Sequence, residues 1–207
     1  MSTLLVIAKE PVPGRVKTRL TPWYTAGEAA LLAEAALVDT LEAVREAEAD
    51  RRVLVLDGAP GPWLPPGFEV VPQVPGGLDR RLAGAFADVS GPALLVGMDT
   101  PQVSPALLTH GLRLAAAGAV FGPAADGGFW ALGLTEPDPA LFPGVPMSVP
   151  ETGALQRRRL TEAGLTVHHL PVLRDVDTPE DARLVADAAP GSRFAAAVAR
   201  LTRAGAR

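Results

Sequence analysis

The sequence contains no cysteine, which excludes disulfides, thiolate metal sites and a cysteine nucleophile. Lysine is nearly absent too, because only Lys9 and Lys17 occur among the 19 basic residues. No apolar run approaches the roughly 18 residues that a membrane-spanning helix needs. The first residues also lack the basic and apolar regions of a secretion signal. We therefore expect a cytoplasmic protein that does not bind membranes.

Strong charge of either sign is also missing. The net charge of -4 and the isoelectric point near 5.4 give no general attraction for nucleic acid, so any anion site must be local. The 207 residues, 48% of them hydrophobic, can close one sizeable core. We expect a single domain over residues 1–207, with a peripheral C-terminal helix from about residue 190.

Apolar strands alternate with amphipathic helices along the chain. Helix starts are marked by a capping box at Thr25 and Glu28 and by Ser104 before Pro105. Strands are expected at 3–8, 52–57, 68–72, 93–97, 119–122, 129–134 and 166–173, and helices at 26–49, 78–89, 105–117, 151–163 and from 179. The alternation predicts a three-layer α/β/α fold with a mostly parallel central sheet, which binds ligands beyond the carboxyl ends of its strands.

A basic loop follows the first strand. It reads AKEPVPGRVKTRL over residues 8–20 and combines both lysines with Arg15 and Arg19. Glycine, proline and clustered cations are typical of a loop that wraps a di- or triphosphate. The spacing is neither that of a P-loop nor that of a dinucleotide fingerprint. A solvated basic turn is the alternative.

Carboxylates follow two of the predicted strands. Asp99 in GMDTP comes directly after the strand at 93–97 and could hold Mg²⁺ or Mn²⁺, or could bond its own backbone in a turn. Asp175 and Asp177 follow the last strand and point the same way if the chain is extended. We predict Asp99 and Asp177 as metal ligands, although Thr178 after them also begins a helix.

The segment GPAADGGFWALG presents Asp126 beside Gly127 and Gly128, where backbone can approach a ligand closely. A sugar or acceptor hydroxyl suits this carboxylate, and an Asp-Gly turn is the alternative. We interpret the loop at 123–128 as a break between two strands rather than a tight hairpin. The three histidines show no metal-ligand spacing, and Ser148 has no partner histidine for a hydrolase triad.

Five segments together resemble a known family. In order they read AKEPVPGRVKTRL, GGLDRRLAGAF, GMDTP, GPAADGGFWALGL and DVDTPEDA. They are similar to a bacterial family of uncharacterised glycosyltransferase-like proteins with the nucleotide-diphospho-sugar transferase (GT-A) fold. The basic loop and the aspartate at the strand end are also similar to 2-phospho-lactate guanylyltransferase and the molybdenum-cofactor nucleotidyltransferases.

The resemblance implies a role for each group of residues. It implies a metal at Asp99 and catalytic roles for Lys17 and Asp126. It implies a nucleotide site formed by Ala8, Lys9, Gly14, Arg15, Lys17, Arg19 and Arg81, and a sugar or acceptor site formed by Asp126, Gly127, Gly128 and Ser148. Four positions depart from the family pattern: Gly77, Asp79, Met147 and Gly97, the last of which breaks the D-x-D motif.

The expected activity is metal-dependent transfer from a nucleotide sugar to a small-molecule acceptor. The alternative is nucleotidyl transfer from a nucleoside triphosphate to a phosphorylated acceptor. A second alternative is a nucleotide-binding module without activity. The expected cofactor is Mg²⁺ or Mn²⁺, nucleic acid is not an expected partner, and a homodimer is left open.

Overall fold

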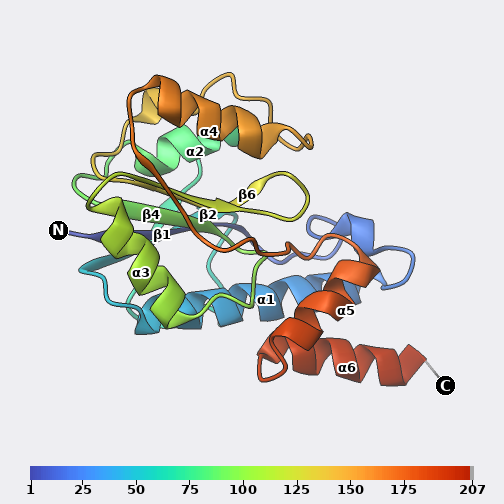
Figure 1. Ribbon diagram of the computed structural model, residues 1–207. Coiled ribbons are helices and arrows are strands. Elements are labelled where there is room, and N and C mark those ends of the chain that lie inside the picture. The colour runs from blue at the N-terminus through green and yellow to red at the C-terminus, as the bar shows by residue number, and fades with distance from the viewer. Residues whose placement is uncertain (206–207) are drawn as a thin grey trace.

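The computed structural model describes residues 1–205 and has three layers (Figure 1). The strands are β1 (Thr3–Lys9), β2 (Arg51–Asp57), β3 (Glu69–Pro72), β4 (Ala93–Gly97), β5 (Ala119–Pro123), β6 (Phe129–Leu134) and β7 (Val167–His169). The helices are α1 (Ala26–Glu46), α2 (Leu78–Phe86), α3 (Pro105–Ala115), α4 (Thr152–Glu162), α5 (Pro179–Ala188) and α6 (Arg193–Gly205), with short 3-10 turns η1 (Thr18–Leu20) and η2 (Pro139–Leu141). This confirms the predicted α/β fold class.

The seven strands form one sheet in the order β3-β2-β1-β4-β6-β5-β7. Every neighbouring pair is parallel except those that involve β6, which runs antiparallel to both β4 and β5. The carboxyl ends of β1, β2, β4 and β5 therefore share one edge of the sheet with the start of β6. Residues of the predicted site follow several of these ends.

Apolar side chains on the two faces of the sheet form separate clusters. Helices α1 and α3 cover one face, and α2 and α4 cover the other (Figure 1). Helices α5 and α6 lie beside the N-terminal half of α1. There, Phe194 of α6 is fully buried and Val198 is nearly so. The C-terminal helix thus contributes to a third apolar cluster. Within residues 1–205, no helix combines the length and apolarity needed to cross a membrane.

The predicted helix starts are confirmed at side-chain level. The hydroxyl of Thr25 accepts a hydrogen bond from Glu28 N, and the carboxylate of Glu28 accepts one from Thr25 N, as the capping box requires. Ser104 accepts a hydrogen bond from Leu107 N at the start of α3, ahead of Pro105. Thr178 and Asp181 form a second capping box on α5, so this helix begins at Pro179, as the sequence predicts.

Two expectations about strands were wrong. The segment at 123–128 is not a break, because β5 pairs antiparallel with β6 and the chain reverses through Gly127, whose φ is 91°; the hairpin is, as expected, not a tight one. The strand expected at 166–173 is only three residues long, since Pro171 has no N–H to donate. Leu173 then rejoins the sheet as an isolated bridge to Ala124. This bridge places the segment that follows Leu173, which contains Asp175 and Asp177, at the carboxyl edge of the sheet, where folds of this kind bind ligands.

Candidate active site

A cavity of about 790 Å³ lies at the carboxyl edge of the sheet, which is within the usual size range of small-molecule sites. The predicted site residues that line it are Ala8, Lys9, Arg15, Lys17, Arg19, Arg81, Asp99, Asp126, Gly128, Ser148 and Asp177. Gly14 and Gly127 do not line it. Segments that are far apart in the sequence thus converge on one concave surface.

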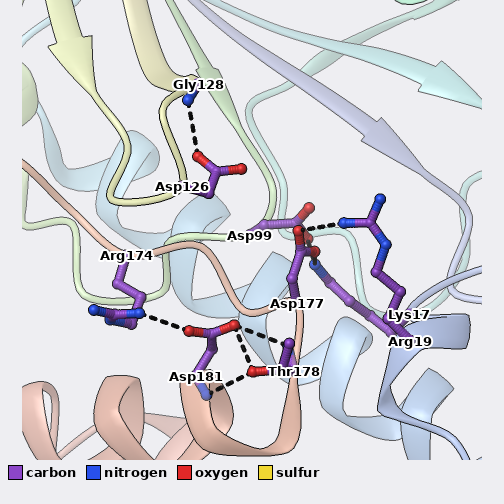
Figure 2. Close-up of polar contacts among 9 residues, drawn as sticks. All are labelled: Lys17, Arg19, Asp99, Asp126, Gly128, Arg174, Asp177, Thr178 and Asp181. Atoms are coloured by element: carbon purple, nitrogen blue, oxygen red, sulfur yellow. Dashed lines mark hydrogen bonds and ion pairs between the residues drawn. The ribbon is translucent and has the colours of Figure 1, made fainter. Parts of the chain in front are cut away.

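Lys17 lines this cavity, and its side chain reaches Asp99 and Asp177 (Figure 2). Its Nζ is 2.8 Å from Asp99 Oδ1 and 3.3 Å from Asp177 Oδ1, and its side chain is only 7% exposed. Burial alone would lower the pKa of Lys17, but the two carboxylates outweigh burial and raise that pKa. Arg19 Nη1 contacts Asp177 Oδ2 at 3.2 Å. Lys17 is therefore a fixed, fully charged cation.

Three buried oxygen atoms of residues that line the cavity have no hydrogen-bond partner among the described residues. These buried atoms are Asp99 Oδ1, Asp175 Oδ1 and Thr100 Oγ1, and all three residues line the cavity. The close contact of Asp99 Oδ1 with Lys17 is an ion pair without the alignment of a hydrogen bond. Burial, with the neighbouring charge of Asp99, raises the pKa of Asp175 to about 7. Asp99 Oδ1 has Lys17 as its ion-pair partner, but the buried oxygens of Asp175 and Thr100 have none, and such oxygens are costly unless a ligand satisfies them.

These oxygens fit a divalent cation. Mg²⁺ and Mn²⁺ prefer carboxylate oxygens, and Mg²⁺ is commonly held by one or two carboxylates together with water and substrate phosphates. Asp99 and Asp175 supply two such groups. Within residues 1–205, however, no set of three or more histidine, cysteine or acidic side chains is arranged to enclose a metal. A metal here would need phosphate or water to complete its ligands.

The backbone explains how the acidic segment reaches Asp99. Val176 N donates a hydrogen bond to Asp99 O at 3.0 Å, and Gln102 Nε2 donates one to Arg174 O at 2.7 Å. These bonds join the loop after β4 to the chain before α5. Asp175 and Asp177 both line the cavity, as period-2 spacing predicts.

A second polar cluster lies at the ends of β2 and β3. Arg81 Nη1 contacts Asp57 Oδ2 at 2.8 Å and also donates to Gln73 Oε1 at 3.0 Å. Gln73 Nε2 in turn donates to Ala8 O at 2.7 Å. Asp57 and Gln73 are not among the site residues predicted from the sequence. Their position at or directly after the ends of predicted strands is the same signal that identified Asp99.

Asp126 lies in the hairpin loop between β5 and β6 and is exposed. Its Oδ1 accepts a hydrogen bond from Gly128 N at 2.9 Å, so the turn proposed as the alternative does form (Figure 2). Its Oδ2 makes no hydrogen bond within the described part of the chain, and Asp126 lines the cavity. One carboxylate oxygen therefore holds the turn while the other can meet a ligand.

The start of α4 packs directly on this turn. Gly153 N donates to Gly127 O at 2.8 Å, and a Cβ added to Gly127 would lie 2.1 Å from Pro150 O. Ser148, in the loop that leads into α4, has a φ of 61°. The other non-glycine residue with positive φ in residues 1–205 is Lys17, at 49°. Such backbone is uncommon for these residue types, and both line the cavity.

We expect Gly127→Ala to lower the free energy of unfolding by about 3–5 kcal/mol, because a left-handed alanine and a backbone overlap add together. Gly144→Ala is the matched control: its φ is 80°, but nothing lies within 4 Å of the added Cβ. We expect only about 1–2 kcal/mol there. Urea unfolding measures both values. Equal losses would show that the contact with Pro150 has no energetic weight.

Solved structures share this fold. A protein from Desulfovibrio desulfuricans G20, provisionally named a nucleotide-diphospho-sugar transferase, is 27% identical with a TM-score of 0.85, over 98% of this chain and 94% of that one. Rv0371c of Mycobacterium tuberculosis H37Rv, in complex with manganese, is 24% identical with a TM-score of 0.51, over 90% and 97%. The 2-C-methyl-D-erythritol 4-phosphate cytidylyltransferase of Thermus thermophilus is 18% identical with a TM-score of 0.53, over 98% and 100%.

These comparisons confirm the predicted transferase fold and the expected similarity to both sugar and nucleotidyl transferases. The chain thus has the fold of these transferases. No curated protein matches the sequence. Residues 28–149, more than half of the chain, match the family described as uncharacterized proteins conserved in bacteria (DUF2064), and the chain belongs to this family.

Proposed function

We propose that this protein is a metal-dependent enzyme that transfers the sugar of a nucleotide diphosphate sugar to an acceptor hydroxyl. The observation that carries the proposal is the buried ammonium of Lys17, which pairs with Asp99 in a cavity that is also lined by the unpartnered carboxylate oxygen of Asp175. An ammonium binds phosphate strongly, and carboxylate oxygens bind the cations that accompany nucleotides. The structure of Rv0371c with manganese, which shares the fold, is consistent with this proposal.

Each polar group then has a role. Lys17 binds the diphosphate, with Lys9 and Arg15 beside it, and Asp99 and Asp175 hold Mg²⁺ or Mn²⁺. Both oxygens of Asp177, the ligand expected from the sequence, contact Lys17 or Arg19. We therefore assign Asp177 to positioning Lys17 and Arg19 rather than to binding the metal. A bound cation would stabilise the charge that develops on the departing diphosphate.

The transfer itself exchanges one carbon–oxygen bond for another. The acceptor oxygen forms a bond to the anomeric carbon while the bond from that carbon to the diphosphate oxygen breaks. The electron pair leaves with the nucleoside diphosphate. The proton of the acceptor hydroxyl passes to the carboxylate of Asp126, whose Oδ2 is free.

Nucleotidyl transfer is the second candidate, and one observation favours it. Lys9, Arg15, Lys17 and Arg19 all line the cavity from one short segment, and four cations suit a triphosphate. In that reaction an acceptor phosphate would attack the α-phosphorus and pyrophosphate would leave. Solved nucleotidyltransferases share the fold, which does not separate the two reactions.

The first test is Asp99→Asn, measured by isothermal titration with nucleoside diphosphates. We expect Mg²⁺ or Mn²⁺ to tighten binding to the unmodified protein at least about tenfold, and the variant to lose this gain. Stability should fall by only about 1 kcal/mol, because Lys17 keeps Asp177 as a partner.

Asp187→Asn is the matched control, since it removes one carboxylate that pairs with Arg183 on the surface of α5, outside the cavity. It should bind nucleotide and metal as the unmodified protein does. If Asp99→Asn keeps the full metal-dependent gain in affinity, Asp99 is not a ligand and this assignment is wrong.

A further inference from the structure

Part of the cavity lining carries no charged side chain. Apart from Arg81, the cations that line the cavity come from residues 9–19. Four other lining residues are apolar and come from segments outside this loop: Leu78 of α2, Phe129 of β6, and Met147 and Val149 of the loop before α4, which we call the apolar wall. Among the described residues of this wall and its neighbours Pro150 and Thr152, there is no lysine, arginine or histidine.

Several contacts hold the apolar wall together. Phe129 and Met147 pack against the core cluster between the sheet and the helices α2 and α4. Asp79 Oδ2 accepts a hydrogen bond from Gly144 N at 3.0 Å, and the rings of Phe86 and Phe142 stack with centroids 5.2 Å apart. These contacts join α2 to the segment that leads into Met147. The departure from the family pattern at Asp79 thus supports this side of the cavity.

Two side chains of the apolar wall are exposed to solvent. Leu78 is 43% exposed and Val149 is 39% exposed, and they are two of the few large hydrophobic side chains that residues 1–205 leave exposed. Apolar side chains exposed inside a concave site indicate a surface that a ligand covers. The wall adjoins Asp126 and Gly128, which line the same cavity.

The guanidinium of Arg81, which also lines the cavity, already has partners. Arg81 lies on α2 between Leu78 and Leu82, but its side chain contacts Asp57 and Gln73 at the ends of β2 and β3. A phosphate or carboxylate placed on the wall would lose its hydration without gaining a counter-charge, and it would face the carboxylate of Asp126. An uncharged group with an apolar body meets neither penalty.

We infer that the acceptor is an uncharged hydroxyl compound whose aliphatic or aromatic body covers the apolar wall while its hydroxyl points to Asp126. The inference rests on the proposed function and adds the chemical class of the acceptor. It excludes a phosphorylated acceptor, and therefore separates the proposed reaction from nucleotidyl transfer.

Two probes of one shape test the inference: 4-phenylbutan-1-ol and its phosphate ester, 4-phenylbutyl phosphate. Both are titrated by saturation-transfer NMR into protein that is saturated with Mg²⁺ and a nucleoside diphosphate, so that the basic loop is occupied. We expect the alcohol to bind at least about ten times more tightly than the ester, a difference of about 1.4 kcal/mol. Equal binding, or tighter binding of the ester, would overturn the inference.

Val149→Arg places a cation on the wall and should reverse this preference without changing the affinity for the nucleoside diphosphate. Val172→Arg is the matched control, because Val172 is 63% exposed and does not line the cavity. It should change neither affinity. If Val149→Arg leaves alcohol binding unchanged, or weakens nucleotide binding equally, the wall does not hold the acceptor.

The nucleotide titration is recorded separately, so it tests the proposed function independently of the inferred acceptor class. Protein that binds no nucleotide contradicts the proposed function, and the probes are then compared on the unloaded protein. Protein that binds nucleotide with metal but rejects the alcohol contradicts only the inference about the acceptor.

Discussion

Lys17→Met is expected to weaken the binding of nucleoside di- and triphosphates by about 10- to 100-fold, because a charged hydrogen bond to phosphate contributes roughly 1.5–3 kcal/mol. Methionine keeps the length and apolar contacts of the side chain but removes the ammonium. The loss should be larger for a triphosphate than for an uncharged sugar analogue. Fluorescence or calorimetric titration at saturating Mg²⁺ measures these affinities.

The same substitution should lower stability by about 1–3 kcal/mol, since Asp99 and Asp177 lose a common partner but remain partly solvated. Lys9→Met is the natural control, because it replaces the only other lysine. Lys9 is exposed at the end of β1, so its replacement should leave the melting temperature unchanged. A Lys17→Met protein that melts lower yet binds nucleotide normally would reduce Lys17 to a structural role.

Asp175→Asn is expected to stabilise the metal-free protein at pH 8 by up to about 4 kcal/mol. In the folded protein, burial and then Asp99 raise the pKa of Asp175 to about 7, from 3.8 as an ordinary group. Between these two values the folded state binds the proton and the unfolded chain does not. The stability of the unmodified protein should therefore fall as pH rises from about 4 to 7, and remain low above pH 7.

Asparagine cannot ionise, so the variant should not show this part of the pH dependence. The variant should also lose the stabilisation that Mn²⁺ gives the unmodified protein at pH 8. Thermal unfolding with a chelator and then with Mn²⁺, at pH 4 and pH 8, measures both effects. A variant that is less stable than the unmodified protein at pH 8 without metal would show that Asp175 is a structural group. Asp187→Asn again controls for net charge.

Local signals in the sequence predicted most of the elements, because caps and apolar periodicity act over a few residues. The capping box at Thr25 and the strand at Ala93–Gly97 are confirmed as predicted. The last strand was predicted too long, although Pro171 was visible in the sequence and interrupts a ladder wherever it falls. The hairpin between β5 and β6 was missed because its loop is longer than a two-residue Asp-Gly turn.

The site was predictable in outline and not in detail. The rule that ligands bind beyond strand ends brought Lys9, Asp99 and Asp126 to one edge, and all three line the cavity. The contact between Lys17 and Asp177 joins residues 160 positions apart, and nothing local in the sequence encodes it. The choice between Asp175 and Asp177 likewise depends on burial and on which oxygens already have partners. Spacing alone cannot give either property.

The most direct test of the proposed activity is to identify the product released from the nucleotide. The protein is incubated with Mg²⁺ and either a panel of nucleotide sugars or a panel of nucleoside triphosphates, with alcohols as acceptors, and the phosphorus-containing products are followed by ³¹P NMR. We predict that nucleoside diphosphate is released from a nucleotide sugar and that Asp99→Asn abolishes this release. Pyrophosphate from a triphosphate, without any nucleoside diphosphate from the sugars, would contradict glycosyl transfer, and tight binding without any product would contradict catalysis altogether.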